Sequence, residues 1–260
     1  MSENYEPEEV RQEEQSAEEK ARQEGITFRM LEGRPIVTYI LIGFTACVYL
    51  AQALTKWKTG LDIPMAVGAK INGYIIYRHQ YWRLITPVFI HGSITHILFN
   101  MYALFTLGPS LEKYYGHFDF LRFYFISGFA GNVLSFVAAP QTVSVGASTA
   151  LFGLIGAQAM FIYKNRRILR NYKAALRNIA FVLVINLAIG LNGGIDNWGH
   201  LGGLLGGTLL AWMCGPEIGF VIDQNKKKAE MVDTVPRSRR EISFALVTLF
   251  FAALAFAFGR

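Results

Sequence analysis

Cysteine is scarce in this chain of 260 residues, which contains only Cys47 and Cys214. Both lie within apolar segments, where a free cysteine usually acts as a small hydrophobic residue. Two isolated cysteines exclude a disulfide-stapled scaffold and a cysteine zinc cluster. The zinc-protease motif HExxH is also missing, and His91 and His96 are five residues apart, so a straight helix does not place both on one ion. We therefore predict no metal site and no cofactor.

Repeated halves and charged residues in the middle of apolar runs are also missing, which disfavours a transporter. Long apolar runs are what the chain does have: it is 52% hydrophobic, with a mean hydropathy of +0.29. About 20 apolar residues cross a bilayer as a helix. Seven runs are candidates: Ile36–Leu54, Ile94–Leu107, Phe120–Ala139, Val145–Tyr163, Ile179–Leu191, Trp198–Met213 and Ile242–Phe258. The second and fifth are short, and they span only if their polar flanks are buried in a bundle. The pattern predicts an all-α, multi-pass integral membrane protein.

The first 34 residues differ from the rest because they carry ten acidic residues and no apolar core. Such a composition is typical of a solvated segment that is disordered or partly helical. We therefore predict an acidic tail over residues 1–34 and expect no signal peptide in it. The composition names no regulatory partner for this tail.

Basic residues concentrate in two links, one after the fourth run and one after the sixth. Short, positively charged loops stay in the cytoplasm. The links 139–144 and 192–197 contain no Lys or Arg, as expected on the opposite side. Seven spans with a cytoplasmic N-terminus place the C-terminus outside, and we expect the plasma membrane. Because each basic run flanks a span and none carries a recognition fold, we predict no nucleic-acid partner.

The link from Thr55 to His91 is the exception to this charge pattern. It is external in this topology, yet it carries five basic residues: Lys56, Lys58, Lys70, Arg78 and Arg83. Its length weakens the charge rule there. The stretch Tyr81–Ile85 combines aromatic, apolar and Arg side chains, so we expect it to lie at headgroup level.

Ser148 and His200 are the candidate reacting residues, because each begins an apolar run that passes from outside to inside. Both side chains are therefore expected in the outer half of the membrane, about a turn below the surface. Serine is a weak nucleophile until a base takes its proton. His200 is the only histidine in the last four runs, so it is the natural base. Polar groups are costly in hydrocarbon and tend to be retained there for a function.

The surroundings of this pair favour a Ser–His dyad over a triad. Asp196 precedes His200 by four residues, and it is better placed to cap the helix that follows. Phe152 shares a helix face with Ser148 and can orient the imidazole. His96 and Asn100 are one turn apart and can donate to an oxyanion, as can the Ser148 amide at a helix N-terminus.

Each of these residues also has a structural interpretation. A serine after Gly-Ala is often a helix-packing residue, and an intramembrane asparagine often bonds a neighbouring helix. Gly203 and Gly207 form a GxxxG motif, which indicates close helix packing. The structural and the catalytic interpretations agree, because helix faces lined by small residues let the Ser148 hydroxyl and the His200 imidazole approach each other.

Taken together, these motifs resemble the rhomboid intramembrane serine proteases, over residues Pro35–Pro216. Five motifs occur in the family's order: Trp82-Arg83, His91-x4-His96-x3-Asn100, Gly108-x3-Glu112-x3-Gly116, Gly146-Ala147-Ser148 and His200-x2-Gly203-x3-Gly207. The chain departs from the commonest pattern in two places, because Gly199 stands where Ala often does and Phe152 where Tyr is frequent. Neither departure removes a reacting group, so we expect activity to persist.

The resemblance implies a six-helix catalytic core over residues 35–216, followed by a basic cytoplasmic linker (217–241) and a seventh transmembrane helix (242–260). It implies that Ser148 is the nucleophile and His200 the base, with His96, Asn100 and the Ser148 amide serving the oxyanion. It implies structural roles for Arg83 and Glu112. The expected activity is cleavage of transmembrane protein substrates near the extracytoplasmic face, with lipid as the surrounding partner. The alternative is a non-catalytic rhomboid-like protein that binds and escorts membrane proteins.

Overall fold

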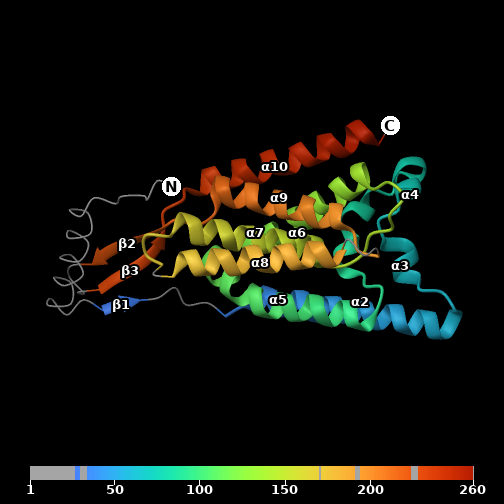
Figure 1. Ribbon diagram of the computed structural model, residues 1–260, viewed down its shortest axis with the longest axis horizontal. Helices are drawn as coiled ribbons and strands as arrows, with labels where there is room; N and C mark the ends of the chain where they lie inside the picture. Colours follow the sequence, from blue (N-terminus) through green and yellow to red (C-terminus); the bar gives the residue numbers. More distant parts are fainter. Residues whose placement is uncertain (1–26, 30–33, 170, 191–193, 224–227, 260) are drawn as a thin grey trace. The chain divides into compact units, whose positions relative to one another are not determined.

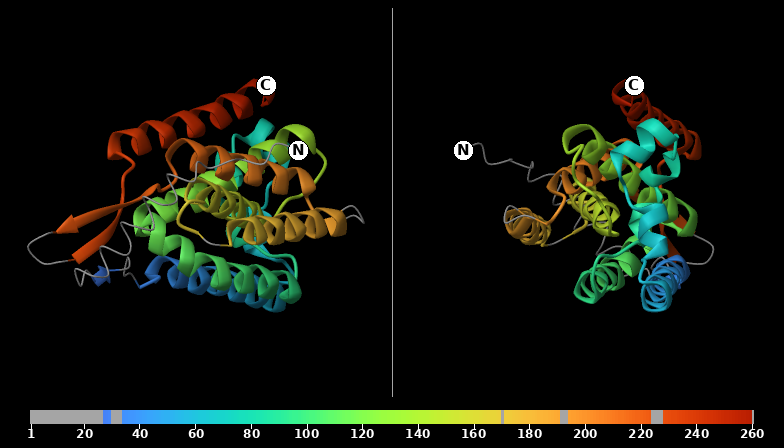
Figure 2. Two further views of the ribbon diagram at one scale, coloured as in Figure 1. Left: turned by 60° about the vertical axis from the view of Figure 1, so that its left-hand side comes forward. Right: turned by 90° about the vertical axis from the view of Figure 1, so that its right-hand side faces the viewer.

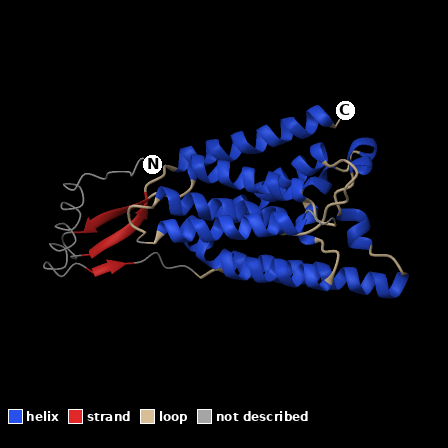
Figure 3. Ribbon diagram, viewed as in Figure 1, coloured by secondary structure: helices blue, strands red, loops and turns tan. Residues whose placement is uncertain are grey.

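The computed structural model describes residues 27–29, 34–169, 171–190, 194–223 and 228–259. These residues form nine α-helices, two short 3₁₀ helices and three strands, coloured by type in Figure 3. The chain divides into two compact units. The helical unit comprises Gly33–Glu217 and Val235–Arg260, and the strand unit comprises Met1–Glu32 and Ile218–Thr234.

The helical unit has a long helix at each of the seven predicted positions. They are α2 (Ile36–Thr59), α5 (Ile94–Tyr115), α6 (His117–Ala138), α7 (Ser148–Lys164), α8 (Tyr172–Gly190), α9 (Asn197–Cys214) and α10 (Arg237–Phe258). Between α2 and α5 lie α3 (Ile63–Gly68), α4 (Asn72–Arg78), η1 (Tyr81–Leu84) and η2 (Thr86–Phe89). Among the described residues, α2, α6, α8 and α10 are long and apolar enough to cross a membrane, judged by length and composition. The chain is therefore an integral, multi-pass membrane protein.

Helices α6, α7 and α9 form the centre of the helical unit, where each packs against the other two. Helices α2 and α5 pair beside this centre, and α10 packs on α6 and α9. Helices α8 and α10 lie at the periphery when the bundle is seen end-on in the right-hand view of Figure 2. The starts of α5, α7 and α9 lie at the same end of the bundle, together with α3 and α4 (Figure 1). The first turns of three helices can therefore contribute to one site.

The contact between α7 and α9 is made by backbone. A Cβ on Gly203 would lie 1.9 Å from the Thr149 carbonyl oxygen, and one on Gly207 would lie 2.1 Å from the Gly153 carbonyl oxygen. Any larger residue at these two positions would therefore force the helices apart. The predicted GxxxG motif is the surface on which α9 rests against α7.

The other end of the bundle is held by Glu112, a buried carboxylate on α5. It accepts hydrogen bonds from the Val37 and Thr38 amides, both at 2.8 Å, and from the Thr38 hydroxyl at 2.6 Å. The carboxylate thus satisfies two of the unpaired N–H groups at the start of α2. His117 contacts the same carboxylate. Glu112 therefore connects α2 and α5 at the end of the bundle opposite to the start of α7.

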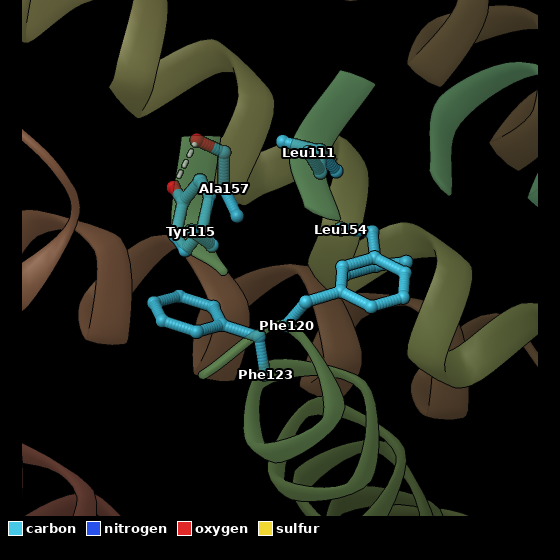
Figure 4. A pocket seen from close by; sticks show the side chains of 6 residues that line it. All are labelled: Leu111, Tyr115, Phe120, Phe123, Leu154 and Ala157. Atoms are coloured by element: carbon cyan, nitrogen blue, oxygen red, sulfur yellow. Dashed lines mark hydrogen bonds between the residues drawn. The ribbon is translucent and has the colours of Figure 1, made fainter. Parts of the chain in front are cut away.

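Apolar packing fills the region between α5, α6 and α7 near this end. Figure 4 shows the side chains involved, which leave no room for a water molecule: Leu111, Tyr115, Phe120, Phe123, Leu154 and Ala157. The Tyr115 hydroxyl is the polar group there, and it donates to the Ala157 carbonyl at 3.1 Å. This half of the bundle is a dry, close-packed core.

The strand unit is a small sheet in the order β1-β3-β2. Strand β1 (Thr27–Arg29) runs parallel to β3 (Lys228–Asp233), and β2 (Ile218–Asp223) runs antiparallel to β3. The prediction of an all-α chain is therefore wrong for these segments. Strand β1 pairs with β3 across most of the chain, so it carries no local pairing signal. Strands β2 and β3 are neighbours in the chain and pair antiparallel, but they lie in the segment that was predicted as a basic linker.

Two predicted boundaries change with the sheet. The segment 217–241, predicted as a linker, contains β2, β3 and the first residues of α10, which begins at Arg237 rather than Ile242. The predicted acidic tail lies outside the described residues, except for the strand Thr27–Arg29 and the residues that follow Gly33.

We expect the variants Gly203→Ala and Gly207→Ala to be destabilised by about 1–3 kcal/mol or more, because overpacking against backbone has no side chain to move aside. The measurement is thermal unfolding of the purified protein in detergent. Gly43→Ala in α2 is the matched control, because a Cβ there meets nothing within 4 Å. Equal melting temperatures for the three variants would contradict the backbone contact.

Candidate active site

Ser148 is the first residue of α7 and follows a tightly held turn. Gly146 has a φ of 121°, which favours glycine. Its amide donates to the Pro87 carbonyl at 2.9 Å, and the Ala147 amide donates to His91 Nε2 at 3.3 Å. Both residues before Ser148 are therefore hydrogen-bonded to the link that joins α2 to α5.

His200 lies in the first turn of α9, and Asp196 caps that helix as predicted. The Asp196 carboxylate accepts from the Gly199 amide at 2.9 Å. The capped start fixes the direction in which the helix leaves the loop. The His200 side chain is directed into the bundle, and the residue is 7% exposed.

The structure brings Ser148 and His200 together. His200 Nε2 lies 2.8 Å from Ser148 Oγ, which is a hydrogen-bonding distance. The ring of Phe152 stacks on the imidazole, with centroids 4.2 Å apart and planes at 9°. Among the described residues, no side chain or backbone group is hydrogen-bonded to His200 Nδ1. The arrangement is a hydroxyl facing a base, and the base is oriented by an aromatic ring instead of a carboxylate.

His96 and Asn100, on α5, lie beside the turn that precedes Ser148. A Cβ on Gly146 would lie 2.6 Å from His96 Nε2 and 3.4 Å from Asn100 Nδ2. The missing side chain of Gly146 therefore makes room for both groups. Asn100 is buried, and its Nδ2 has no acceptor among the described residues. The Ser148 amide is at the N-terminus of α7, where helix N–H groups have no intrahelical partner. His96 and Asn100 therefore lie next to the turn that leads into the Ser148 amide.

His91 is a contact that the sequence reasoning did not assign to the site. Its ring lies 5.0 Å from that of His96. Burial lowers the pKa of His91 to about 3, and neighbouring His96 lowers it as well. The ring is therefore neutral at physiological pH, which fits Nε2 accepting the Ala147 amide. Within the described part of the chain, no group of three or more metal-ligating side chains forms a metal site.

A polar hollow of about 360 Å³ opens beside His91. Its lining comes from the end of α2 and the following link: Tyr49, Gln52, Ala53, Lys56, Trp57, Asp62, His91 and Gly92. The Gln52 amide donates to the His91 carbonyl at 3.1 Å and to Asp62 at 2.9 Å. The hollow is therefore lined by polar groups next to His91.

Three residues of the predicted site lie away from the Ser148–His200 pair. Arg83 is 2% exposed and donates to the Ala66 and Ala69 carbonyls, both at 2.7 Å. The Arg83 guanidinium is therefore bonded inside the link. Trp82 is exposed and donates to the Val67 carbonyl at 3.1 Å. Glu112 lies at the opposite end of α5.

Comparison with known proteins gives a family. A model described as "Rhomboid domain" matches residues 78–217. The rhomboid protease GluP of Bacillus subtilis (strain 168) is 35% identical over 204 residues, which is 78% of this chain and 39% of that protein. RHOMBOID-like protein 1 of Arabidopsis thaliana is 34% identical over 198 residues, or 75% of this chain and 49% of that protein. Less than half of each of these two relatives is therefore covered.

The protein YdcA of Bacillus subtilis (strain 168) gives a fuller match. It is 35% identical over 191 residues, which is 69% of this chain and 88% of that protein. The domain match covers more than half of the chain and includes the starts of α5, α7 and α9. The chain therefore belongs to the rhomboid family.

Proposed function

We propose that this protein is an intramembrane serine endopeptidase that cleaves transmembrane helices near the extracytoplasmic face, with Ser148 and His200 as a catalytic dyad. The observation that carries the proposal is the 2.8 Å approach of His200 Nε2 to Ser148 Oγ at the starts of two packed helices. A serine and a histidine held this way are the minimum for nucleophilic catalysis by an activated hydroxyl. They lie in the same helical unit as four helices long and apolar enough to cross a membrane.

The reaction follows from this geometry. Ser148 Oγ attacks the carbonyl carbon of the scissile peptide, and His200 Nε2 takes the hydroxyl proton. When the tetrahedral intermediate collapses, the C–N bond breaks and the imidazolium gives that proton to the leaving amine. Water then attacks the acyl-enzyme ester with His200 again as the base, which releases the new carboxylate and restores the serine. Phe152 keeps the imidazole plane aligned through both proton transfers.

The oxyanion of each intermediate is assigned to three donors: His96, the Asn100 amide and the Ser148 N–H. Donors fixed before the reaction stabilise the developing charge without reorganisation. An Asn100 Nδ2 with no acceptor among the described residues supports this role, because a buried donor left unpaired in the resting state is costly. The Ser148 amide adds the positive end of the α7 dipole.

We assign a six-helix core made of α2, α5, α6, α7, α8 and α9, with α10 as an additional seventh span. The N-terminus is then cytoplasmic and the C-terminus extracytoplasmic, and the plasma membrane is the expected location. The five basic residues of the link from α2 to α5 remain the exception to the charge rule, which carries less weight in a long link.

The substrate is assigned as a transmembrane helix that unwinds locally. A helix hides its carbonyl groups in its own hydrogen bonds, so residues with low helix propensity near the cut should promote cleavage. Hydrolysis also needs water at Ser148. The hollow beside His91 is one polar opening on the outer side through which water can enter.

The principal test is cleavage of a single-span model substrate in liposomes. We expect Ser148→Ala and His200→Ala to abolish cleavage while both proteins fold, because either change removes a reacting group. Cys47→Ala and Cys214→Ala are the controls and should retain activity. A fluorophosphonate probe should label the wild type and not Ser148→Ala. Absence of both cleavage and labelling in the wild type would instead favour a non-catalytic escort protein.

Asn100→Ala should lower kcat by about 10- to 1000-fold without abolishing it, as expected for one lost oxyanion donor. The measurement is initial-rate kinetics on the same substrate, with folding checked by thermal unfolding. A wild-type rate in this variant would leave Asn100 as a packing residue.

Phe152→Tyr should keep kcat near the wild-type value, because the stacked ring is retained. Phe152→Ala should lower kcat by about 2- to 10-fold, in line with an aromatic stacking contribution of about 0.5–1.5 kcal/mol. Kinetics of both variants beside the wild type decide this point. Identical rates for the Tyr and Ala variants would rule out an orienting role for the ring.

A further inference from the structure

Lys70 is the most unusual charged residue in the described chain outside the site. It lies between α3 and α4, and it is 0% exposed. Its ammonium donates to three backbone carbonyls: Ser135 at 3.3 Å, Ala139 at 3.1 Å and Thr142 at 2.8 Å. A lysine ammonium has three N–H donors. Every donor therefore has an acceptor, which compensates for burial of the charge.

These three carbonyls belong to the end of α6 and the chain just beyond it. Helix α6 ends at Ala138, and its last carbonyls carry the negative end of the helix dipole. A cation at this position is favourable because it donates to carbonyl groups that the helix leaves unpaired and because it lies at the negative end of the dipole. Burial lowers the pKa of Lys70 to about 8, while Asp196 raises it, so the ammonium is the main form at neutral pH. Lys70 is a cationic cap on α6 supplied by a different loop.

The backbone of Lys70 also bonds to the segment that joins α6 to α7. Its amide donates to the Ser144 carbonyl at 3.0 Å, and the Ser144 amide donates back to the Lys70 carbonyl at 3.2 Å. This isolated antiparallel bridge ends four residues before Ser148. The connection from α6 to α7, residues 139–147, is thus tied to Lys70 at its start through the side chain and near its end through the backbone.

The last part of this connection is held by other residues of the same external link. Pro87 accepts the Gly146 amide, and His91 accepts the Ala147 amide. The Lys70 backbone is itself held, because Arg83 donates to the carbonyl of the preceding residue, Ala69. The two hydrogen-bonded residues, Gly146 and Ala147, directly precede Ser148.

We propose that Lys70 is a positioning residue for Ser148. By fixing residues 139–144 to the external link, it sets the place at which α7 begins, and therefore the approach of the Ser148 hydroxyl to His200 and of the Ser148 amide to the oxyanion. This inference rests on the proposed function. It extends that function to Lys70, one of the basic residues that do not fit the charge pattern of the predicted topology.

Asn72 provides a matched control from the same loop. Its Nδ2 donates to the Phe136 carbonyl at 2.7 Å, so it also caps the end of α6. Among the described residues, the Asn72 side chain makes no hydrogen bond to residues 139–147. Loss of Asn72 therefore weakens the α6 end alone, whereas loss of the Lys70 ammonium also releases the start of the connection, at Ala139 and Thr142.

The experiment compares Lys70→Met and Asn72→Ala with the wild type in liposomes. It measures kcat and KM for a single-span substrate, thermal unfolding, and hydrogen exchange of residues 139–147 by mass spectrometry. We expect Lys70→Met to lower kcat by about 10- to 100-fold with KM unchanged, because small misplacements of reacting groups are that costly. Exchange in 139–147 should accelerate. Asn72→Ala should lower the melting temperature and leave kcat close to the wild-type value.

The outcomes separate the two proposals. A wild type that neither cleaves nor reacts with the fluorophosphonate rejects the proposed function, while the exchange data still report on the tether. An active wild type with an unchanged kcat in Lys70→Met rejects only the positioning role, as does an equal loss of kcat in Asn72→Ala. If Lys70→Met does not fold, Lys70→Gln replaces it. Failure of both to fold, while Asn72→Ala folds, would overturn positioning in favour of a purely structural role.

Discussion

The backbone contact between α7 and α9 is the constraint on which the rest of the helical unit depends. Gly203 and Gly207 allow the two helix axes to approach until a Cβ would collide with a carbonyl oxygen. In a bundle surrounded by lipid, such close packing replaces the hydrophobic driving force available to soluble proteins. The same approach brings the first turns of both helices together, so the Ser148–His200 contact is a consequence of the packing.

Three buried charged residues bond backbone groups at helix ends in this bundle. Glu112 on α5 accepts from the start of α2, and Lys70 donates to the end of α6. Arg83 in turn donates to the carbonyl preceding Lys70. Each charge therefore neutralises backbone groups that a helix end leaves unpaired. Two of these residues, Lys70 and Arg83, lie in the link from α2 to α5, and the same link accepts hydrogen bonds from the turn before Ser148.

Much of this arrangement could be predicted from local sequence patterns. The apolar runs placed all seven long helices, and small residues beside Ser148 and His200 indicated close packing. The helix cap at Asp196 followed from its position before an apolar run. Strand β1 could not be found this way, because it pairs with β3 across most of the chain. Strands β2 and β3 are neighbours in the chain, and they were missed because residues 217–241 were predicted as a basic linker. The carbonyl groups that Arg83 bonds could not be found this way either, because Ala69 and Ala66 lie 14 and 17 residues away in sequence.

Residue types and periodicity therefore determined the helices, the membrane class and the candidate nucleophile and base, because these depend on neighbours within a few turns of the chain. The tertiary structure alone decided which lysine becomes a buried cap and which histidine supports the turn before Ser148. The carbonyls that Lys70 meets lie 65 to 72 residues away in sequence. Hydrogen bonds at such separations leave no periodic trace, since they depend on where folded helices end in space.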